Sequence, residues 1–156
     1  MIDLRSVWGL ETLETGTRPG VRVARRRPGG LEAVSGSVLV KDETRGGFYA
    51  WGMEDRIISA MNRCLQFWQT VGVAPPLLVG LTLSGVRGWK VLRGAYDYDD
   101  VDGALDRNVV TAPEVILSDF AIPQDVLLRP LFDVVWNGGG WLGSPNYKDG
   151  RWIKPR

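Results

Sequence analysis

The sequence contains no histidine and a single cysteine, Cys64, among its 156 residues. Without an imidazole, the chain lacks the usual general base near neutral pH and the commonest zinc ligand. One cysteine excludes an internal disulfide, and Ser-His and Cys-His nucleophilic mechanisms are excluded as well. Cys64 falls within an apolar helical pattern, so we expect it to pack in the core rather than to react. These residue types predict no metal site and no cofactor.

Long apolar runs and a strong charge bias are also missing. No run approaches the roughly 20 apolar residues of a membrane span, and the first residues, Met1-Ile2-Asp3, lack the regions of a signal peptide. We therefore expect a cytoplasmic protein that does not enter a membrane. The net charge of +1 argues against a general polyanion binder, so any binding of DNA or RNA needs a local basic patch.

The length and the composition, with 44% hydrophobic and 24% charged residues, suit one globular domain. Residues 1–20 read as an N-terminal segment or linker, and residues 21–156 as a single α+β domain. Strand patterns occur at residues 21–24, 31–40, 48–51, 77–83 and 115–117. Residues 89–92 either complete a hairpin or continue a strand past a bulge. We predict a small, mainly antiparallel sheet with one long helix, a short C-terminal helix and a packed aromatic tail.

The clearest helix is predicted at residues 54–71. Its apolar stripe comprises Ile57, Met61, Cys64, Leu65 and Trp68. Glu54 and Asp55 suit the positive N-terminal end of the helix, and Gly72 is a natural C-terminal stop.

The C-terminal region contains a second helix and an aromatic tail. We expect Pro130 to open this helix as its first residue, with residues 123–128 forming a separate turn. The glycines at 138–140 end it, and because they follow a helix instead of preceding one, a phosphate-binding loop is disfavoured. Beyond them, Trp141 and Trp152 can each bury a large apolar area. They predict a tail held against the surface of the domain.

Arginines cluster around the first predicted strand, where Arg22, Arg25, Arg26 and Arg27 precede a Pro-Gly-Gly turn. Such a run can bind phosphates, with Arg87 and Lys90 extending the face if they point the same way and Trp89 or Tyr49 stacking on bases. The alternative is a solvated edge strand that charge protects against aggregation.

Aspartates cluster in the stretch from Tyr96 to Asp106, at positions 97, 99, 100, 102 and 106. The spacing fails that of a calcium loop, because Val101 and Asn108 stand where ligands are required. A solvated acidic loop is the simpler interpretation, and a magnesium site of a nuclease or hydrolase is the alternative.

Four pieces of the sequence resemble a known family: the helix at 54–71, LLVGLTLSGVRGWKVL, APEVILSDF and LLRPLFDVVWNGGGWLGSPNYKDGRW. They are similar to the C-terminal region of bacterial Schlafen-like proteins, whose N-terminal half is an AlbA-like domain associated with DNA or ATP binding. The matching positions at the end of the chain are Leu128, Arg129, Pro130, Asp133, Trp136, Asn137, Ser144, Pro145, Asn146, Gly150 and Trp152. The AlbA-like half has no counterpart here, so its binding activity does not transfer.

The resemblance implies an accessory domain, in a setting related to bacterial defence, with a structural role for these end positions. A buried Asn137 would cap the helix end or hold the tail backbone. The leading hypothesis is a non-catalytic module that packs on a partner protein or domain, or on a second copy. The second hypothesis is a DNA- or RNA-binding module that uses the arginine cluster, and a metal-dependent enzyme is a minor third.

Overall fold

The fold is known from a computed structural model. The structure describes residues 7–8, 10–11, 21–26, 30–35, 38–94 and 103–154, and side chains at residue 35 and over 38–94 and 103–154. It contains helices α1 (Ala50–Thr70) and α2 (Gln124–Gly138). The strands are β1 (Val7–Trp8), β2 (Leu10–Glu11), β3 (Val21–Arg26), β4 (Gly30–Ser35), β5 (Val40–Asp42), β6 (Gly47–Tyr49), β7 (Leu77–Val79), β8 (Thr82–Ser84), β9 (Lys90–Leu92), β10 (Val109–Thr111), β11 (Val115–Leu117), β12 (Tyr147–Lys148) and β13 (Arg151–Trp152).

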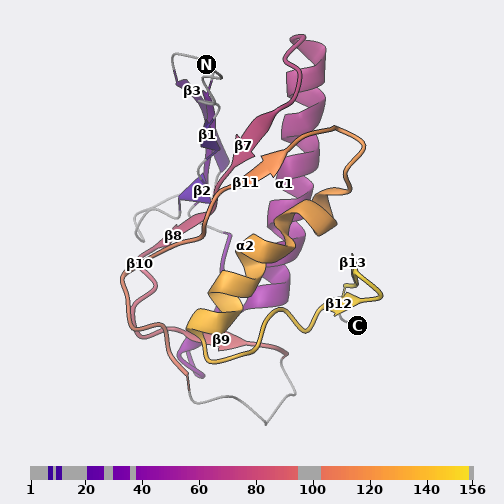
Figure 1. Cartoon of the computed structure of the whole chain (residues 1–156). Helices are drawn as coiled ribbons and strands as arrows, with labels where there is room; N and C mark the ends of the chain where they lie inside the picture. Colours follow the sequence, from indigo (N-terminus) through magenta and orange to yellow (C-terminus); the bar gives the residue numbers. More distant parts are fainter. Residues whose placement is uncertain are drawn as a thin grey trace.

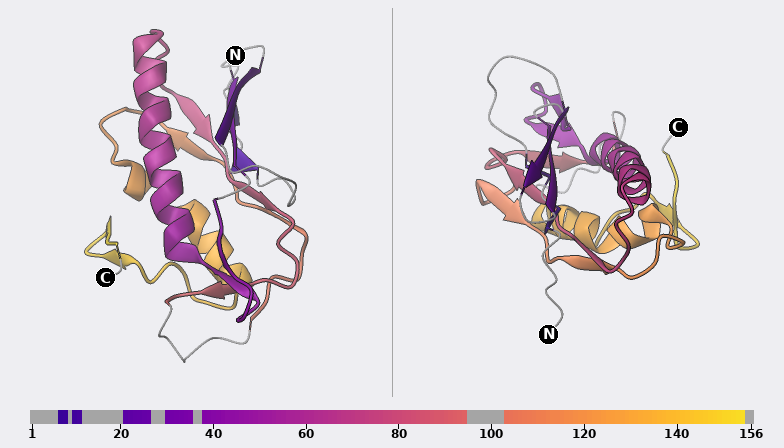
Figure 2. Two further views of the ribbon diagram at one scale, coloured as in Figure 1. Left: turned by 180° about the vertical axis from the view of Figure 1, so that it is seen from behind. Right: turned by 90° about the horizontal axis from the view of Figure 1, so that it is seen from above.

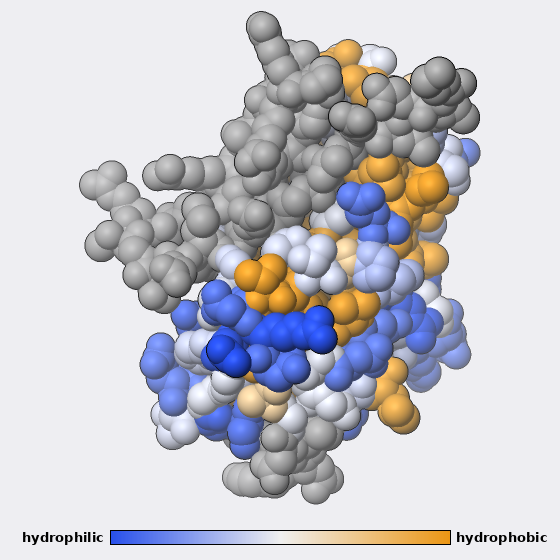
Figure 3. Space-filling view, turned by 60° about the vertical axis from the view of Figure 1, so that its left-hand side comes forward, coloured by the Kyte–Doolittle hydropathy of each residue, from blue (hydrophilic) through white to orange (hydrophobic). Residues whose placement is uncertain are grey.

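The strands form several small sheets in which antiparallel pairing dominates, which confirms the predicted α+β class. β7 pairs with β11 and β8 with β10, so that residues 77–84 and 109–117 run side by side as a long ribbon. β1 and β2 link this ribbon to the β3–β4 hairpin, because β1 pairs with β7 and β2 with β4, both in parallel. Figure 1 shows the ribbon beside α1 and α2, and Figure 3 brings the β8 and β10 side forward, where apolar patches lie between hydrophilic ones.

Two strand predictions, at residues 31–40 and 89–92, differ from the structure. The expected strand at 31–40 ends at Ser35, and β5 begins at Val40 in a different sheet. That sheet has the order β5–β6–β9, and β9 lies parallel to β6 instead of completing a hairpin with the strand before it. Parallel pairing joins segments far apart in sequence, so neither local turn signals nor alternation could predict it.

Helix α1 begins four residues earlier than predicted, in a segment that we expected to be extended. Ala50 and Met53 are fully buried, and Gly52 lies so close to Val40 that a Cβ atom there would approach Val40 Cγ2 to 2.8 Å. Tertiary packing therefore favours the helix over the local strand signal. As a result, Glu54 lies on the second turn of α1 and not at its positive N-terminal end. The predicted C-terminal stop is confirmed, since Gly72 follows the helix with φ +73°.

The prediction that Pro130 opens α2 is wrong, because α2 runs without interruption from Gln124 to Gly138. Leu127 and Leu128 before the proline are buried on the same side as Leu131 and Phe132 after it. The packing of this continuous apolar stripe outweighs the hydrogen bond that a proline in a helix interior removes.

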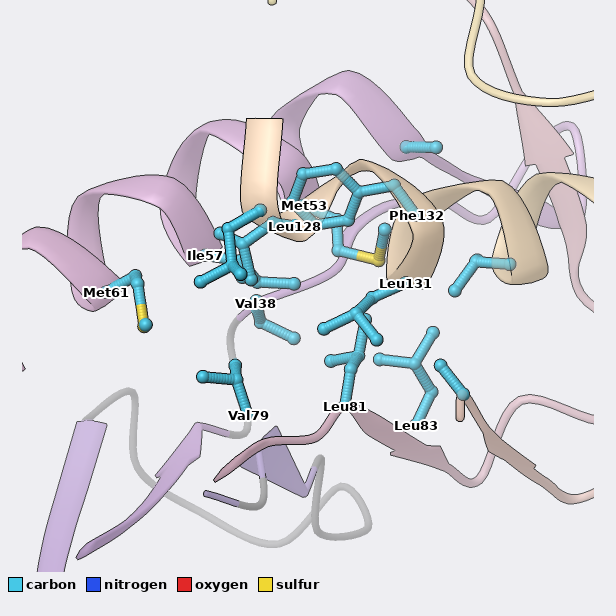
Figure 4. Packing of buried hydrophobic residues seen from close by; sticks show 14 of the residues in the cluster. Val38, Met53, Ile57, Met61, Val79, Leu81, Leu83, Leu128, Leu131 and Phe132 are labelled. Atoms are coloured by element: carbon cyan, nitrogen blue, oxygen red, sulfur yellow. The ribbon is translucent and has the colours of Figure 1, made fainter. Parts of the chain in front are cut away.

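Both helices pack on one face of the ribbon formed by residues 77–84 and 109–117 (Figure 2). Along residues 77–83 every second side chain is buried and points towards the helices, which confirms the expected buried strand. These leucines and valines interdigitate with residues of α1 and α2, among them Ile57, Leu128 and Leu131 (Figure 4). The core therefore holds α1 and α2 together, and on the opposite face of the ribbon Val109, Thr111 and Ile116 are exposed.

Candidate functional site

The most elaborate polar cluster in the described part of the chain surrounds Glu54, which has 0% of its surface exposed. Its Oε1 atom accepts hydrogen bonds from Trp136 Nε1 at 2.8 Å and from Ser144 Oγ at 2.6 Å. Its Oε2 atom accepts hydrogen bonds from Asn146 Nδ2 and Trp152 Nε1, both at 2.7 Å. Four donors on two oxygens suit an ionised carboxylate, because a protonated one would have to donate as well. We call these five residues the Glu54 cluster.

The sequence places the Glu54 cluster on three elements. Glu54 comes from α1, Trp136 from the last turn of α2, and the other donors from the tail that follows α2. Trp136 is also fully buried, and its ring meets that of Trp141 edge to face at a centroid distance of 5.5 Å. The cluster therefore binds the tail to both helices at once.

A second carboxylate holds the far end of the tail. Asp125, on the first turn of α2, accepts two hydrogen bonds from the Arg151 guanidinium and one from the Trp152 N–H. Its backbone oxygen accepts a hydrogen bond from the Tyr147 hydroxyl at 2.6 Å. Burial raises the pKa of Asp125, but the Arg151 guanidinium and the Trp152 N–H outweigh it, so that the pKa lies below its usual value. Burial, together with the charges of Glu54 and Asp125, raises the pKa of Tyr147.

A third carboxylate fixes the start of the tail. Asp133 Oδ1 accepts a hydrogen bond from Ser144 N at 2.8 Å, and Asp133 also forms an i,i+4 ion pair with Arg129 at 3.8 Å. The Arg129 guanidinium in turn lies 5.0 Å from the centroid of the Tyr147 ring. Gly143 has φ +152° and lies so close to Asp133 that a Cβ atom there would be 2.9 Å from Oδ1. A glycine is therefore required at this turn.

Most of the motif residues at the end of the chain meet in this region. Arg129, Asp133, Trp136, Asn146 and Trp152 all contact the tail or belong to it. The expectation of a buried Asn137 is wrong, since Asn137 is exposed, and Asn146 supplies the amide that holds the tail. Glu54 itself was missed as an acceptor. The signal for it is its position three residues before Ile57, on the apolar stripe of α1, where an acid needs buried donors.

The structure describes the arginine cluster only in part. Arg22, Arg25 and Arg26 belong to β3, but their side chains, like the whole of Arg27, lie outside the described residues. Arg87 is exposed and Lys90 lies on β9.

The β5–β6–β9 sheet brings further basic residues near Lys90. Lys41 on β5 lies over the Trp89 ring, with Nζ 4.7 Å from the ring centroid, and Arg45 donates a hydrogen bond to Gly94 O. Tyr49 is less suited to stacking, because its hydroxyl donates to Asp42 at 2.6 Å. This hydrogen bond is the main cause that lowers the pKa of Asp42.

The remaining predictions concern the acidic stretch, Cys64, metal binding and membrane spans. Positions 97, 99, 100 and 102 of the acidic stretch lie outside the described residues, and Asp106 is exposed beside Arg107. Cys64 is buried, and burial raises the pKa of its thiol to about 11, which keeps it protonated near neutral pH. Within the described ranges, no group of three acids, cysteines or histidines is placed to hold a metal ion. No helix among those described is long and apolar enough to span a membrane.

Comparison with known proteins adds no relative. No family model matches the chain, and neither the curated proteins nor the solved structures give a match. The similarity to the C-terminal region of Schlafen-like proteins therefore stays a prediction.

A cavity of about 10 Å³ lies between α1, α2 and β7, lined by apolar residues that include Ile57, Met61, Val79 and Leu128 (Figure 4). It has room for no more than one water molecule, and a cavity with such a lining stays dry. It is too small to be a ligand site.

Replacement of the buried carboxylate tests the Glu54 cluster. In Glu54→Gln, an amide NH₂ group would face two of the four donors, and hydrogen bonds to a charge, each contributing about 1.5–3 kcal/mol, would be lost. We expect the free energy of unfolding to fall by about 3 kcal/mol or more, measured by urea denaturation followed by tryptophan fluorescence. The matched control is the neighbouring Asp55→Asn, which breaks only the surface pair with Lys154, worth about 0.2–1 kcal/mol. Equal losses in the two variants would contradict the role of Glu54.

The lowered pKa of Asp125 predicts a dependence of stability on pH. A carboxyl whose pKa is lower in the folded protein stabilises the fold above its unfolded pKa of about 3.9, and this contribution is lost as the pH falls through the folded value. Below about pH 4 we expect the wild-type free energy of unfolding to decrease more steeply than that of Asp125→Asn or Arg151→Gln. Denaturant titrations across this range measure the difference, and identical slopes in all three proteins would refute the assignment.

Proposed function

We propose that this chain is a non-catalytic accessory domain that packs on a partner protein or on a second copy of itself, as in a Schlafen-like, defence-related protein. The observation that carries the proposal is the Glu54 carboxylate, whose two oxygens are saturated by four donors inside the fold. A carboxylate in this state has no free acceptor site for a substrate proton or a metal ion. The chemistry of the cluster is therefore used to hold the tail.

The surface supports an interaction role. Apolar side chains that would gain from burial are exposed in the described part of the chain: Phe67, Val71, Val109, Ile116, Val126, Leu142 and Ile153. Leu142 projects fully into solvent in the turn after α2, at 105% of its reference area. Apolar residues surrounded by charged ones are typical of protein interfaces.

The proposal is tested by the state of the protein at its natural abundance. A tagged copy, expressed at its native level in the cells that encode it, is expected to purify in a stoichiometric complex with another protein or with itself. Light scattering on the purified material gives the mass of the complex. A strict monomer at all concentrations, with no stoichiometric partner, would overturn the proposal.

Nucleic-acid binding is the second candidate, favoured by the position of Lys41 over Trp89 on the sheet that also carries Lys90. A cation and an aromatic ring side by side can contact a phosphate and a base of one single strand. In this alternative the arginines at positions 22, 25, 26 and 27 extend the contact, together with Arg87 and Lys90.

The dependence of affinity on salt concentration tests the nucleic-acid-binding alternative. We expect the affinity for labelled DNA or RNA, measured by fluorescence anisotropy, to fall with salt, and each lost phosphate contact to reduce the slope of log K against log salt by about 1. Arg25→Glu/Arg26→Glu/Arg27→Glu and Lys41→Glu are the test variants, and Arg63→Glu, on the exposed side of α1, is the control. Binding that does not depend on salt, or that the control weakens equally, would exclude the alternative.

A further inference from the structure

The strand formed by residues 109–117 is the outermost one of the ribbon. β10 pairs with β8 and β11 with β7, on the same side, and the link between them is kept by a hydrogen bond from Ala112 N to Leu81 O. On its other side this strand has no strand partner among the described residues. It is therefore a sheet edge, and such edges present unpaired N–H and C=O groups.

The register shows which backbone groups face outward. In an antiparallel pair, successive residues direct their N–H and C=O groups alternately towards and away from the neighbouring strand. Ala112 N points towards Leu81, so the backbone groups of Thr111 and Val109 point away from β8. The outward N–H and C=O groups of alternate residues are therefore available to pair with a further strand.

The side chains on the same strand are apolar and exposed. Val109 and Ile116 retain 49% and 53% of their surface, and Thr111 between them is also exposed. The opposite face of the ribbon is covered by α1 and α2 (Figure 2). β-Branched side chains on an open edge can pack against alternate side chains of an added strand.

The charge of the edge restricts the partner. Between Val109 and Asp119 the sequence contains two acids, Glu114 and Asp119, and no basic residue. Both acids are exposed. A second copy that paired through the same edge would bring like charges together, which disfavours self-pairing, whereas lysine or arginine beside an incoming strand would be attracted.

We propose that residues 109–117 bind an extended segment of a partner protein by addition of a strand to this edge. The segment has apolar residues at alternate positions and lysine or arginine on its flanks. This inference rests on the proposed function, because it names the surface and the class of partner of the accessory domain. Backbone hydrogen bonds supply affinity in this mode of recognition, and the alternate side chains and flanking charges supply selectivity.

Pro113 divides the edge into β10 and β11 and limits uncontrolled growth. It lacks an N–H group and is exposed between the two strands. Proline and acidic residues are typical devices that prevent an edge strand from pairing with any exposed strand. The edge thus accepts a short segment of opposite charge and does not support the open-ended addition of further strands.

Two synthetic fluorescent peptides test the proposal on the full chain. Both alternate valine and threonine, and one carries two lysines at each end while the other carries two glutamates. We expect the lysine-flanked peptide to bind about tenfold more tightly in fluorescence anisotropy. Val109→Lys/Ile116→Lys, which places charge on the apolar edge, should abolish this binding. The matched control, Phe67→Lys/Val71→Lys, alters equally exposed apolar residues at the end of α1 and should leave it unchanged.

A second variant tests the backbone hydrogen bonds of the edge. Thr111→Pro eliminates an outward N–H while leaving the inward bonds of the β8–β10 ladder in place, so it should weaken peptide binding without loss of cooperative unfolding. Binding of neither peptide, equal binding of both, or binding that survives the edge variants would overturn the proposal. Self-association that is lost in Val109→Lys/Ile116→Lys would also overturn it, by making a second copy the occupant. A stoichiometric complex that forms with these variants as well would refute this inference while leaving the proposed function intact.

Discussion

The hydrogen bonds between the buried Glu54 carboxylate and four donors are the interaction on which the rest of the structure depends. They join α1, α2 and the tail at one point. An ionised group with no exposed surface is stable only if its oxygens are fully hydrogen-bonded. Loss of any one of the four donors would therefore leave the buried charge incompletely paired. Because two of the donors are indole N–H groups, the rings that hold the carboxylate also exclude water from it.

The tail is held by carboxylates along its whole length. Asp133 binds its start, Glu54 its middle and Asp125 its end, and these acids come from two helices that the apolar core has already packed together. The tail thus adds few residues to the core and is bound to both helices. The edge at residues 109–117 takes no part in holding the tail, and it has no second strand partner among the described residues.

Much of the fold followed from local patterns. The stripe on α1, the buried alternation at 77–83 and the glycine stops after both helices depend on periodicity and on the conformational freedom of glycine. The predictions that proved wrong concern places where distant packing outweighs a local preference. At Pro130, buried leucines on both sides keep α2 continuous, and at Ala50 close packing against β5 extends α1 into an apparent strand.

The sequence by itself determined the α+β class, the absence of imidazole and disulfide chemistry, and the presence of a tail that has to bury its tryptophans. These are consequences of residue type and spacing, which act locally. Only the tertiary structure decided that Glu54 is the acceptor for that tail, that Asn146 and not Asn137 supplies the amide, and that β9 runs parallel to β6. Each of these joins residues distant in sequence, and the direction of a side chain or a strand across such a distance is set by the packing of the whole domain.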